Sequence, residues 1–598
     1  MSLRFNLGMK ILNVIAAFGL AALCSSPVLA ATAANATSPL GINLNYLSYY
    51  DPEEPFLNIF KTTGVTQNNP SGWWTRDASM NETNEEAYLQ LDSSGYPSTL
   101  KASASDPNSP QKFTQACAII LRLQPSNAGT GLPYQAGQYV VLYDGVGTIQ
   151  VGMDASMVST SQSATGGRDV FNVAKPTQNG VWICVSSTSA TNHLNNIRVV
   201  KAEDESLLDA GQIYTPGFLG LMQNFGVIRA MQWQKMDDNP GPPGNWADRA
   251  QLTDAGWASE SGAPLEAMVS LCNAVGADCW LNVPQTADDN YITQMATLVH
   301  QQLGSTQKVY VEFSNEVWNG IYPQNKYATS EGAALWPSAT SSQDNRDWYG
   351  MRTAQMCDIW AQVWGSDDAR VHCDLGAQAA VPSTATESLN CPLWTAGAPC
   401  YKHHITDVAI APYFSWGAMQ TPSAWNALDV AAALNDIFNQ ITAGGEISGA
   451  TAALAQVSGW EAAYKKALAP YGLPYIAYEG GQSLLGFPAY MNGSAVVNEY
   501  IAANRDARMG TAYTTALNDW KANGGETYVL YDDVYFPGEY GEWGLLESFM
   551  DTVSPLTSAP PKWQATQSFI TNNPCWWSGC ARTVADAPQA PSGFKVAN

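Results

Sequence analysis

The sequence predicts an α/β fold, a (β/α)8 barrel with a small β-sandwich inserted into it. From about residue 201 onward, short apolar strand-like runs alternate with helix-like runs, as in parallel sheets covered by helices. Residues 100–205 instead hold short runs separated by Gly, Pro, Ser and Asn, a spacing typical of a β-sandwich. Residues 41–44 supply a first strand that brings the barrel to eight.

The barrel strands are predicted from apolar runs bounded by turn residues, and the helices from apolar periodicity. The expected strands after the first are residues 227–231, 279–283, 309–313, 370–375, 408–413, 475–478 and 528–531. The expected helices are residues 263–275, 289–303, 348–364, 459–468 and 496–521. In this order the run at 309–313 is the fourth strand and the run at 475–478 is the seventh.

The sandwich is predicted from six short runs that no helical pattern interrupts. They are residues 118–123, 138–143, 148–153, 170–173, 181–186 and 197–200. We therefore expect five segments along the chain: a signal peptide (1–30), the start of the barrel (31–99), the inserted sandwich (100–205), the remainder of the barrel (206–573) and a C-terminal tail (574–598).

The pattern of the first thirty residues predicts that the protein is exported. Arg4 and Lys10 precede an apolar run at 11–23, and Ala30 offers a cleavage point, as in a secretory signal peptide. That run is shorter than the roughly 20 residues of a membrane span, and no later run reaches that length. We expect a protein that is secreted, either extracellular or periplasmic, with no membrane span.

Ten cysteines follow the predicted signal peptide, an even number that suggests disulfides in an exported chain. Spacing alone does not prove their connectivity. Proximity along the chain suggests five pairs: Cys117 with Cys184, Cys272 with Cys279, Cys357 with Cys373, Cys391 with Cys400, and Cys575 with Cys580.

Composition excludes several classes of protein. The chain has 52 acidic and 28 basic residues, so its formal net charge of −24 repels a nucleic-acid backbone. Adjacent His403 and His404 cannot both face one side of a strand, and no cysteines have C-x-x-C spacing, so we expect no metal site. Gly145-Val146-Gly147 lacks the following helix of a nucleotide loop, and no cofactor is expected. The oligomeric state stays open.

Two glutamates follow predicted barrel strands. Asn315-Glu316 comes directly after the run at 309–313, and Glu479 with two glycines ends the run at 475–478. Barrel active sites lie at the C-terminal ends of the strands. Retaining glycoside hydrolysis needs a proton donor and a nucleophile about 5–5.5 Å apart, and two such strand ends can supply them.

These residues resemble the retaining glycoside hydrolases of clan A, whose barrels carry an Asn-Glu acid/base on strand four and a Glu nucleophile on strand seven. The resemblance covers roughly residues 38–100 and 206–570. It implies that Glu316 is the general acid/base, Glu479 the nucleophile, and Asn315 the donor to the sugar 2-hydroxyl. Arg229 is similar to the arginine beside the nucleophile, and Tyr413 to the aromatic or His residues that line the site. The sandwich is not general in the clan, which leaves the substrate open.

Aromatic side chains near the strand ends are candidates for stacking on sugar rings. Trp318 follows Glu316 closely, and Trp543 resembles the strand-eight platform aromatic of the clan. The other candidates are Trp73, Trp74, Trp233, Trp416 and Tyr531. Each of them fits core packing about equally well.

Competing interpretations concern other acids. Glu312 shares a strand face with Glu316 but lies about 13 Å deeper, so we interpret it as a buried structural group. Asp532, Asp533, Glu539 and Glu542 fit either a cation site or a solvated loop, and we favour the loop. Glu316 and Glu479 could also be surface-loop acids, and Arg229 an ordinary ion-pair partner.

The sequence thus predicts a secreted hydrolase, a retaining endo-β-glycanase that cuts a β-linked polysaccharide of the glucan or mannan type by double displacement. The alternative is a catalytically inactive carbohydrate-binding protein whose sandwich holds the glycan. Sugar identity, linkage, endo or exo action and the role of the sandwich stay open.

Overall fold

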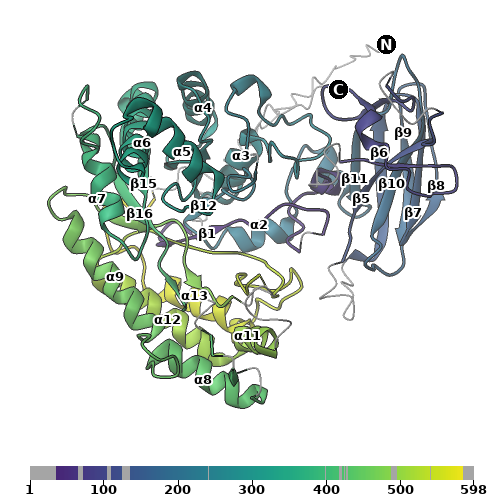
Figure 1. Ribbon diagram of the computed structural model, residues 1–598. Coiled ribbons are helices and arrows are strands. Elements are labelled where there is room, and N and C mark those ends of the chain that lie inside the picture. Colours follow the sequence, from purple (N-terminus) through teal and green to yellow (C-terminus); the bar gives the residue numbers. More distant parts are fainter. Residues whose placement is uncertain are drawn as a thin grey trace, which may run out of the picture.

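The computed structural model describes most of the chain after the predicted signal peptide. The described residues are 35–50, 52–64, 72–103, 110–123, 135–239, 241–397, 399–416, 421–422, 424–425, 428–485, 495–538 and 540–582. The predicted signal peptide and most of the predicted tail lie outside them. Figure 1 shows a helix-covered barrel with a separate pair of sheets to one side.

Eight parallel strands form a closed barrel, which confirms the predicted fold class. In barrel order they are β1 (Leu40–Asn43), β12 (Val227–Arg229), β13 (Asp278–Val283), β14 (Val309–Phe313), β15 (Val371–Gly376), β16 (Asp407–Ile410), β18 (Tyr475–Ala477) and β20 (Tyr528–Leu530). β1 pairs in parallel with both β12 and β20 and so closes the barrel. β14 is the fourth strand and β18 the seventh, as predicted.

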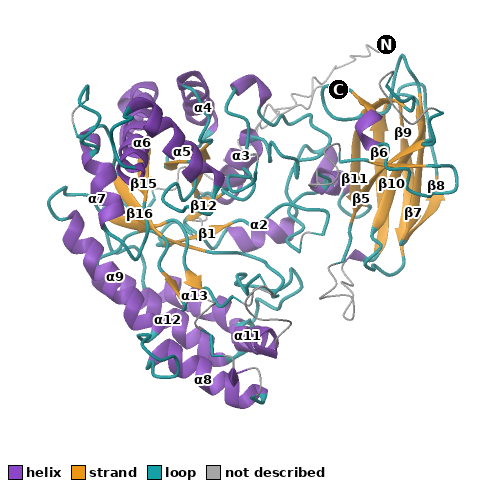
Figure 2. Ribbon diagram, viewed as in Figure 1, coloured by secondary structure: helices purple, strands orange, loops and turns teal. Residues whose placement is uncertain are grey.

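Helices surround the barrel (Figure 2). Those described are α2 (Pro216–Met222), α3 (Leu265–Val275), α4 (Asp289–Gln302), α5 (Pro323–Leu335), α6 (Ser341–Trp364), α7 (Ser383–Asn390), α8 (Val430–Thr442), α9 (Ala453–Leu468), α11 (Ala495–Arg505), α12 (Ala507–Asn523) and α13 (Pro561–Asn572). The single helix predicted over 496–521 is wrong, because Asp506 separates α11 from α12. Its side chain accepts a hydrogen bond from the backbone N–H of Arg508 and caps α12.

Strand alternation divides the barrel core into two layers. Val309, Val311 and Phe313 of β14 pack against the helices, whereas Tyr310 belongs to a second apolar cluster with Trp280, Ile476 and other strand residues. Because neighbouring strand residues point to opposite faces, this second cluster fills the barrel interior. The interior is therefore packed, and the polar strand-end residues lie on top of it.

The inserted region is built of two four-stranded antiparallel sheets that enclose a separate apolar core. One sheet has the order β2 (Trp74–Arg76), β5 (Gln115–Ile120), β10 (Val181–Thr188) and β7 (Gly147–Met153). The other has the order β11 (Asn195–Lys201), β6 (Gly137–Asp144), β9 (Gly166–Val173) and β8 (Ala155–Ser159). Two strands were not expected: β2 comes from before residue 100, and β8 is too exposed to show an apolar pattern. The division of the chain at residues 99 and 205 stays a prediction.

All five expected disulfides are present. They join Cys117 to Cys184, Cys272 to Cys279, Cys357 to Cys373, Cys391 to Cys400, and Cys575 to Cys580. Within the described ranges, none of the helices is both long and apolar enough to cross a membrane.

We expect the disulfide between β5 and β10 to stabilise the sandwich strongly, because Cys117 and Cys184 are 67 residues apart and close a long loop in the unfolded chain. Replacing both by Ala should lower the free energy of unfolding by about 4 kcal/mol. The matched control replaces Cys575 and Cys580, which are 5 residues apart, and should cost about 2 kcal/mol. Urea unfolding monitored by fluorescence measures both, and a larger loss in the control would contradict the prediction.

Candidate active site

The side chain of Arg229, at the end of β12, joins four other side chains at the mouth of the barrel. Its Nη1 donates to Asn43 Oδ1 at 2.9 Å and to Glu479 Oε1 at 2.7 Å. Its Nη2 donates to Glu312 Oε2 at 2.9 Å and to Asn315 Oδ1 at 2.8 Å. Arg229 is fully buried. Its guanidinium is planar and holds its N–H donors in a fixed arrangement, which suits these four acceptors. Strands one, two, four and seven thereby converge on one charge.

Glu312 is the deeper of the two anionic partners of Arg229. It is fully buried and also accepts hydrogen bonds from Trp280 Nε1 at 3.1 Å and Asn282 Nδ2 at 3.0 Å. Its burial within β14 confirms the predicted position in the barrel interior.

Glu479 follows β18 and turns towards the same arginine. Its Oε1 accepts from Arg229, and its Oε2 accepts from the hydroxyl of Tyr413 at 3.0 Å. One of these two donors is charged, which makes that hydrogen bond the stronger of the two. The structure therefore places Glu479, Arg229, Asn315 and Tyr413 in one hydrogen-bonded cluster.

Glu316 lies just beyond β14, where the backbone leaves the strand through left-handed conformations at Ser314 (φ 61°) and at Glu316 itself (φ 44°). Non-glycine residues rarely adopt this region, and such strain concentrates at functional sites. Glu316 Oε1 accepts from the hydroxyl of Tyr478 at 2.9 Å, and Oε2 accepts from Asn319 Nδ2 at 2.8 Å. No cation contacts it in the described part of the chain.

The two strand-end acids differ in their electrostatic surroundings. Burial, reinforced by the negative charge of Glu479, raises the pKa of Glu316 to about 8. Glu316 is therefore protonated at neutral pH, whereas Glu479 is ion-paired with Arg229. The two acids follow β14 and β18, parallel strands whose C-terminal ends lie at the same opening of the barrel.

Tyr413 lies beyond the sixth strand, not within it as predicted. β16 ends at Ile410, and Tyr413 belongs to the short strand β17 (Tyr413–Phe414), which pairs with β19 (Gly481–Gln482). Trp543 packs against Tyr413 with ring centroids 5.6 Å apart, and against Tyr531 at 5.4 Å. These three rings form an aromatic group beside Glu479.

The remaining aromatic candidates are not joined to this cluster. Trp318 is half-buried, and its indole Nε1 has no hydrogen-bond partner among the described residues. Trp233 is fully buried against Phe56, with ring centroids 5.1 Å apart. Core packing likewise accounts for Trp73 and Trp416, which are buried, and for Trp74, which packs on Trp182 in the sandwich.

Tyr478 and Asp237 are among the residues around these acids that escaped the sequence analysis, as are Asn43 and Asn319. Tyr478 lies two residues after Ile476, so both side chains point into the barrel. This alternation along the strand could have predicted the inward position of Tyr478. Asp237 accepts a hydrogen bond from Asn315 Nδ2 at 2.8 Å through its Oδ1. It lies in the loop after β12, where no periodicity distinguishes it from its neighbours.

The solvated-loop interpretation of the acids after β20 is wrong. Asp532, Asp533 and Glu542 are almost completely buried. Asp533 Oδ1 accepts from the backbone N–H groups of Asn45 and Val534, which ties this loop to the one after β1. Glu539 lies outside the described residues. Across the part of the chain that the structure describes, no cluster of His, Cys, Asp or Glu is suited to hold a metal ion.

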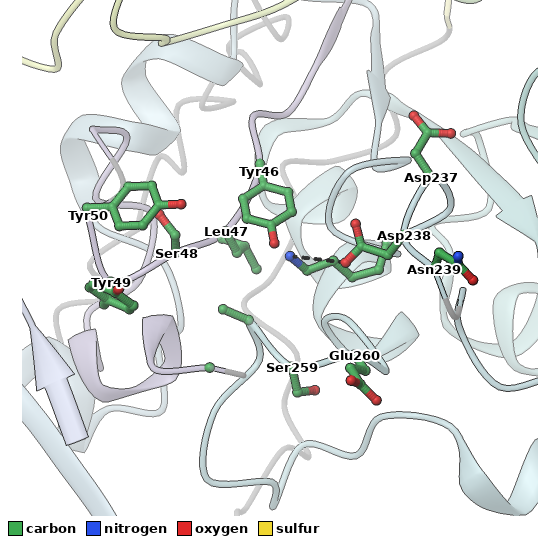
Figure 3. A pocket seen from close by; sticks show the side chains of 13 residues that line it. Tyr46, Leu47, Ser48, Tyr49, Tyr50, Asp237, Asp238, Asn239, Ser259 and Glu260 are labelled. Atoms are coloured by element: carbon green, nitrogen blue, oxygen red, sulfur yellow. Dashed lines mark ion pairs between the residues drawn. The ribbon is translucent and has the colours of Figure 1, made fainter. Parts of the chain in front are cut away.

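A pocket of about 410 Å³ adjoins the cluster (Figure 3). Its wall is formed by the loop after β1 (residues 46–50), part of the loop after β12 (residues 235–239 and 258–260) and Gly64. Lys235 Nζ lies 3.1 Å from the ring centroid of Tyr46 and 3.9 Å from Asp238 Oδ2. Asp237 lines this pocket and also binds Asn315, so the pocket and the acids share a wall.

No protein-family model matches this chain, and no curated protein sequence matches it. Among solved structures, broad-specificity GH5-4 endoglucanases from Clostridium longisporum and Clostridium acetobutylicum are similar to it at 13% identity. The alignments cover 61% and 59% of this chain and 88% and 89% of theirs, with TM-scores of 0.34 and 0.33. A modular endo-β-1,4-mannanase of glycoside hydrolase family 26 from Cellulomonas fimi is 10% identical, with 57% of this chain and 62% of that chain covered and a TM-score of 0.30.

We expect Arg229→Met to destabilise the protein severely, because it leaves the buried carboxylates of Glu312 and Glu479 without a counter-charge. Removing one partner of a buried ion pair costs about 3–5 kcal/mol. Arg168→Met is the matched control: its partner is Glu205 and its side chain is 48% exposed, so the loss should stay within about 1 kcal/mol. Urea unfolding of both variants checks this, and equal midpoints would contradict it.

Proposed function

We propose that this protein is a secreted retaining glycoside hydrolase, an endo-β-glycanase that cuts a β-linked polysaccharide of the glucan or mannan type. One observation carries the proposal: at one barrel mouth Glu479 is ion-paired with Arg229, whereas Glu316 has only the neutral donors Tyr478 and Asn319, and its pKa is raised. Two carboxyl groups so differentiated are what glycoside cleavage by general acid and nucleophile requires. Five disulfides support an oxidising, exported location.

In the first step, the carboxylate of Glu479 attacks the anomeric carbon and forms a glycosyl ester while the glycosidic C–O bond breaks. Glu316 gives its proton to the departing oxygen. Tyr413 and Arg229 hold the nucleophile in place through its two oxygens. Asn315 has one N–H on Asp237 and carries a second, which we assign to the 2-hydroxyl of the sugar.

In the second step, water hydrolyses the glycosyl ester on Glu479. Formation of the ester removes the negative charge of Glu479, which had helped to raise the pKa of Glu316. The pKa of Glu316 therefore falls, and the ionised Glu316 accepts a proton from the incoming water. Hydrolysis of the ester releases the sugar and restores both carboxyl groups to their starting forms.

Sugar rings would bind on the aromatic group of Tyr413, Tyr531 and Trp543, which borders the nucleophile. Trp318, half-buried and two residues after Glu316, is proposed as a further stacking surface. The pocket behind Asp237 offers additional room for sugar units of a longer chain.

The nucleophile assignment predicts that Glu479→Ala abolishes hydrolysis across a panel of β-glucans and β-mannans. Added azide should restore bond cleavage and yield a glycosyl azide of inverted configuration, because a small anion fills the space of the lost carboxylate. The matched control is Glu387→Ala, a surface acid paired with Arg346, which should keep wild-type activity. Product analysis by reducing-end assay and NMR measures both effects.

Full activity of Glu479→Ala would refute the nucleophile assignment. Wild-type protein that binds the polysaccharides without releasing products would instead identify a catalytically inactive carbohydrate-binding protein. Release of a single terminal sugar in place of mixed oligosaccharides would exclude endo action.

The pH dependence tests the role of Glu316. A general acid must be protonated, so kcat/KM on an oligosaccharide should fall as the pH rises through about 8, the pKa of Glu316. The Tyr478 hydroxyl stabilises the ionised form of Glu316, so Tyr478→Phe should raise that pKa and move the falling limb to higher pH. Tyr471→Phe, which alters a hydroxyl that binds Asn390 on the surface, is the control. A shift of the limb to lower pH in Tyr478→Phe would contradict the assignment.

A further inference from the structure

We infer that Asp237 is a positioning residue that holds the side-chain amide of Asn315 in one orientation, with its second N–H directed at the substrate. This inference rests on the proposed function, because the contact between Asn315 and a sugar hydroxyl is part of it. Asp237 lies in the loop after β12 and was not identified by any motif. Three observations on the described residues carry the inference.

The first observation is that Asn315 is held at both ends of its amide. Its Oδ1 accepts from Arg229 Nη2 at 2.8 Å, and its Nδ2 donates to Asp237 Oδ1 at 2.8 Å. Arginine has only donors and an ionised carboxylate only acceptors. If the side-chain amide of Asn315 were flipped, its N–H would face the N–H of Arg229 and its oxygen would face the oxygen of Asp237. Both contacts therefore exclude the flipped orientation. Without Asp237, only the contact with Arg229 would resist rotation of the amide.

The second observation is that Asp237 is itself placed precisely. Gln324, a fully buried residue of α5, donates through Nε2 to the backbone oxygen of Asn315 at 2.6 Å and to Asp237 Oδ1 at 3.3 Å. The loop takes a left-handed turn at Lys235 (φ 59°), whose ammonium group lies over Tyr46. These contacts anchor the segment on either side of Asp237.

The third observation is that Asp237 and the adjacent Asp238 bind different side chains. Asp238 Oδ2 lies 3.9 Å from Lys235 Nζ. In Figure 3 the carboxyl group of Asp237 points away from that of Asp238. Asp237 lines the pocket as Asp238 does, but it has a different partner. Its carboxyl group binds the residue that precedes the proposed acid/base.

Asp237 also contributes charge to the site. Its negative charge, after burial and the charge of Glu479, raises the pKa of Glu316, while burial raises the pKa of Asp237 itself to about 7. The other ionisable side chains that face Asp237 are Glu479, Arg229, Tyr322 and Tyr531. Loss of the charge on Asp237 should therefore lower the pKa of Glu316. This effect is separable from the hydrogen bond to Asn315.

Two variants separate the effect of the hydrogen bond between Asp237 and Asn315 from the effect of the negative charge on Asp237. Asp237→Asn keeps an oxygen that accepts from Asn315 but removes the charge, whereas Asp237→Ala removes both. We expect kcat/KM on the polysaccharide that the wild type cleaves to fall about 10- to 100-fold in Asp237→Ala, mainly through kcat. In Asp237→Asn the loss should be only a few-fold. Both variants should move the falling limb of the pH profile to lower pH.

The control is Asp248→Asn, an exposed acid in the same connection between β12 and α3, which should match the wild type in activity and pH profile. Thermal unfolding of all variants identifies any that fail to fold. A crystal structure of Asp237→Ala gives a second readout that needs no activity. We expect the Asn315 amide to rotate or to occupy two orientations, while Arg229 keeps its contact with Glu479.

Wild-type kcat/KM in Asp237→Ala, equal losses in the Ala and Asn variants, or an unchanged Asn315 amide in the crystal structure would each overturn the inference. If the wild type cleaves none of the polysaccharides, the proposed function fails. The crystal structure of Asp237→Ala then still decides whether Asp237 positions Asn315.

Discussion

The mouth of the barrel depends on the buried guanidinium of Arg229. Burying a charge is costly unless it is paired and hydrogen-bonded, and the two terminal nitrogens of Arg229 find their acceptors only because strands one, four and seven each direct side chains to it. The barrel supplies such convergence, since parallel strands all present their C-terminal ends at one opening. Asn315 and Glu479 are oriented by their hydrogen bonds to this guanidinium. Glu479 in turn binds Tyr413, and Asn315 binds Asp237.

The same arrangement separates the behaviour of two chemically identical side chains. Glu479 has the guanidinium and a tyrosine hydroxyl, whereas Glu316 has only neutral donors, from Tyr478 and Asn319. Desolvation disfavours a carboxylate that lacks a cation, and a second carboxylate nearby disfavours it further. The proposed proton donor and the proposed nucleophile are thus distinguished by their neighbours and not by residue type.

The sandwich follows the first barrel strand, so the chain leaves the C-terminal end of β1 before it enters the sheets. Residues 46–50 belong to this connection and line the pocket together with the loop after β12. Tyr49 in turn packs on Trp74 of the sandwich, with ring centroids 5.9 Å apart. The insertion therefore helps to shape the space beside the acids, even though its own apolar core is separate.

Local pattern in the sequence was sufficient for the barrel strands, their order and most of the sandwich strands, because periodicity encodes which residues face the core. Short spacing was sufficient for four disulfide pairs, whereas Cys117 and Cys184, 67 residues apart, were paired as the next cysteines along the chain. Local pattern also placed Asn315-Glu316 and Glu479 after strands four and seven, since strand order follows chain order in this fold. The cap at Asp506, which binds the nearby Arg508, is a local feature that the prediction of a single helix missed. The burial of Asp532, Asp533 and Glu542 and the contact between Asp237 and Asn315 were decided only by the tertiary structure. Both depend on groups from distant parts of the chain, whose approach sets solvent exposure and hydrogen-bond partners that no local window of sequence contains.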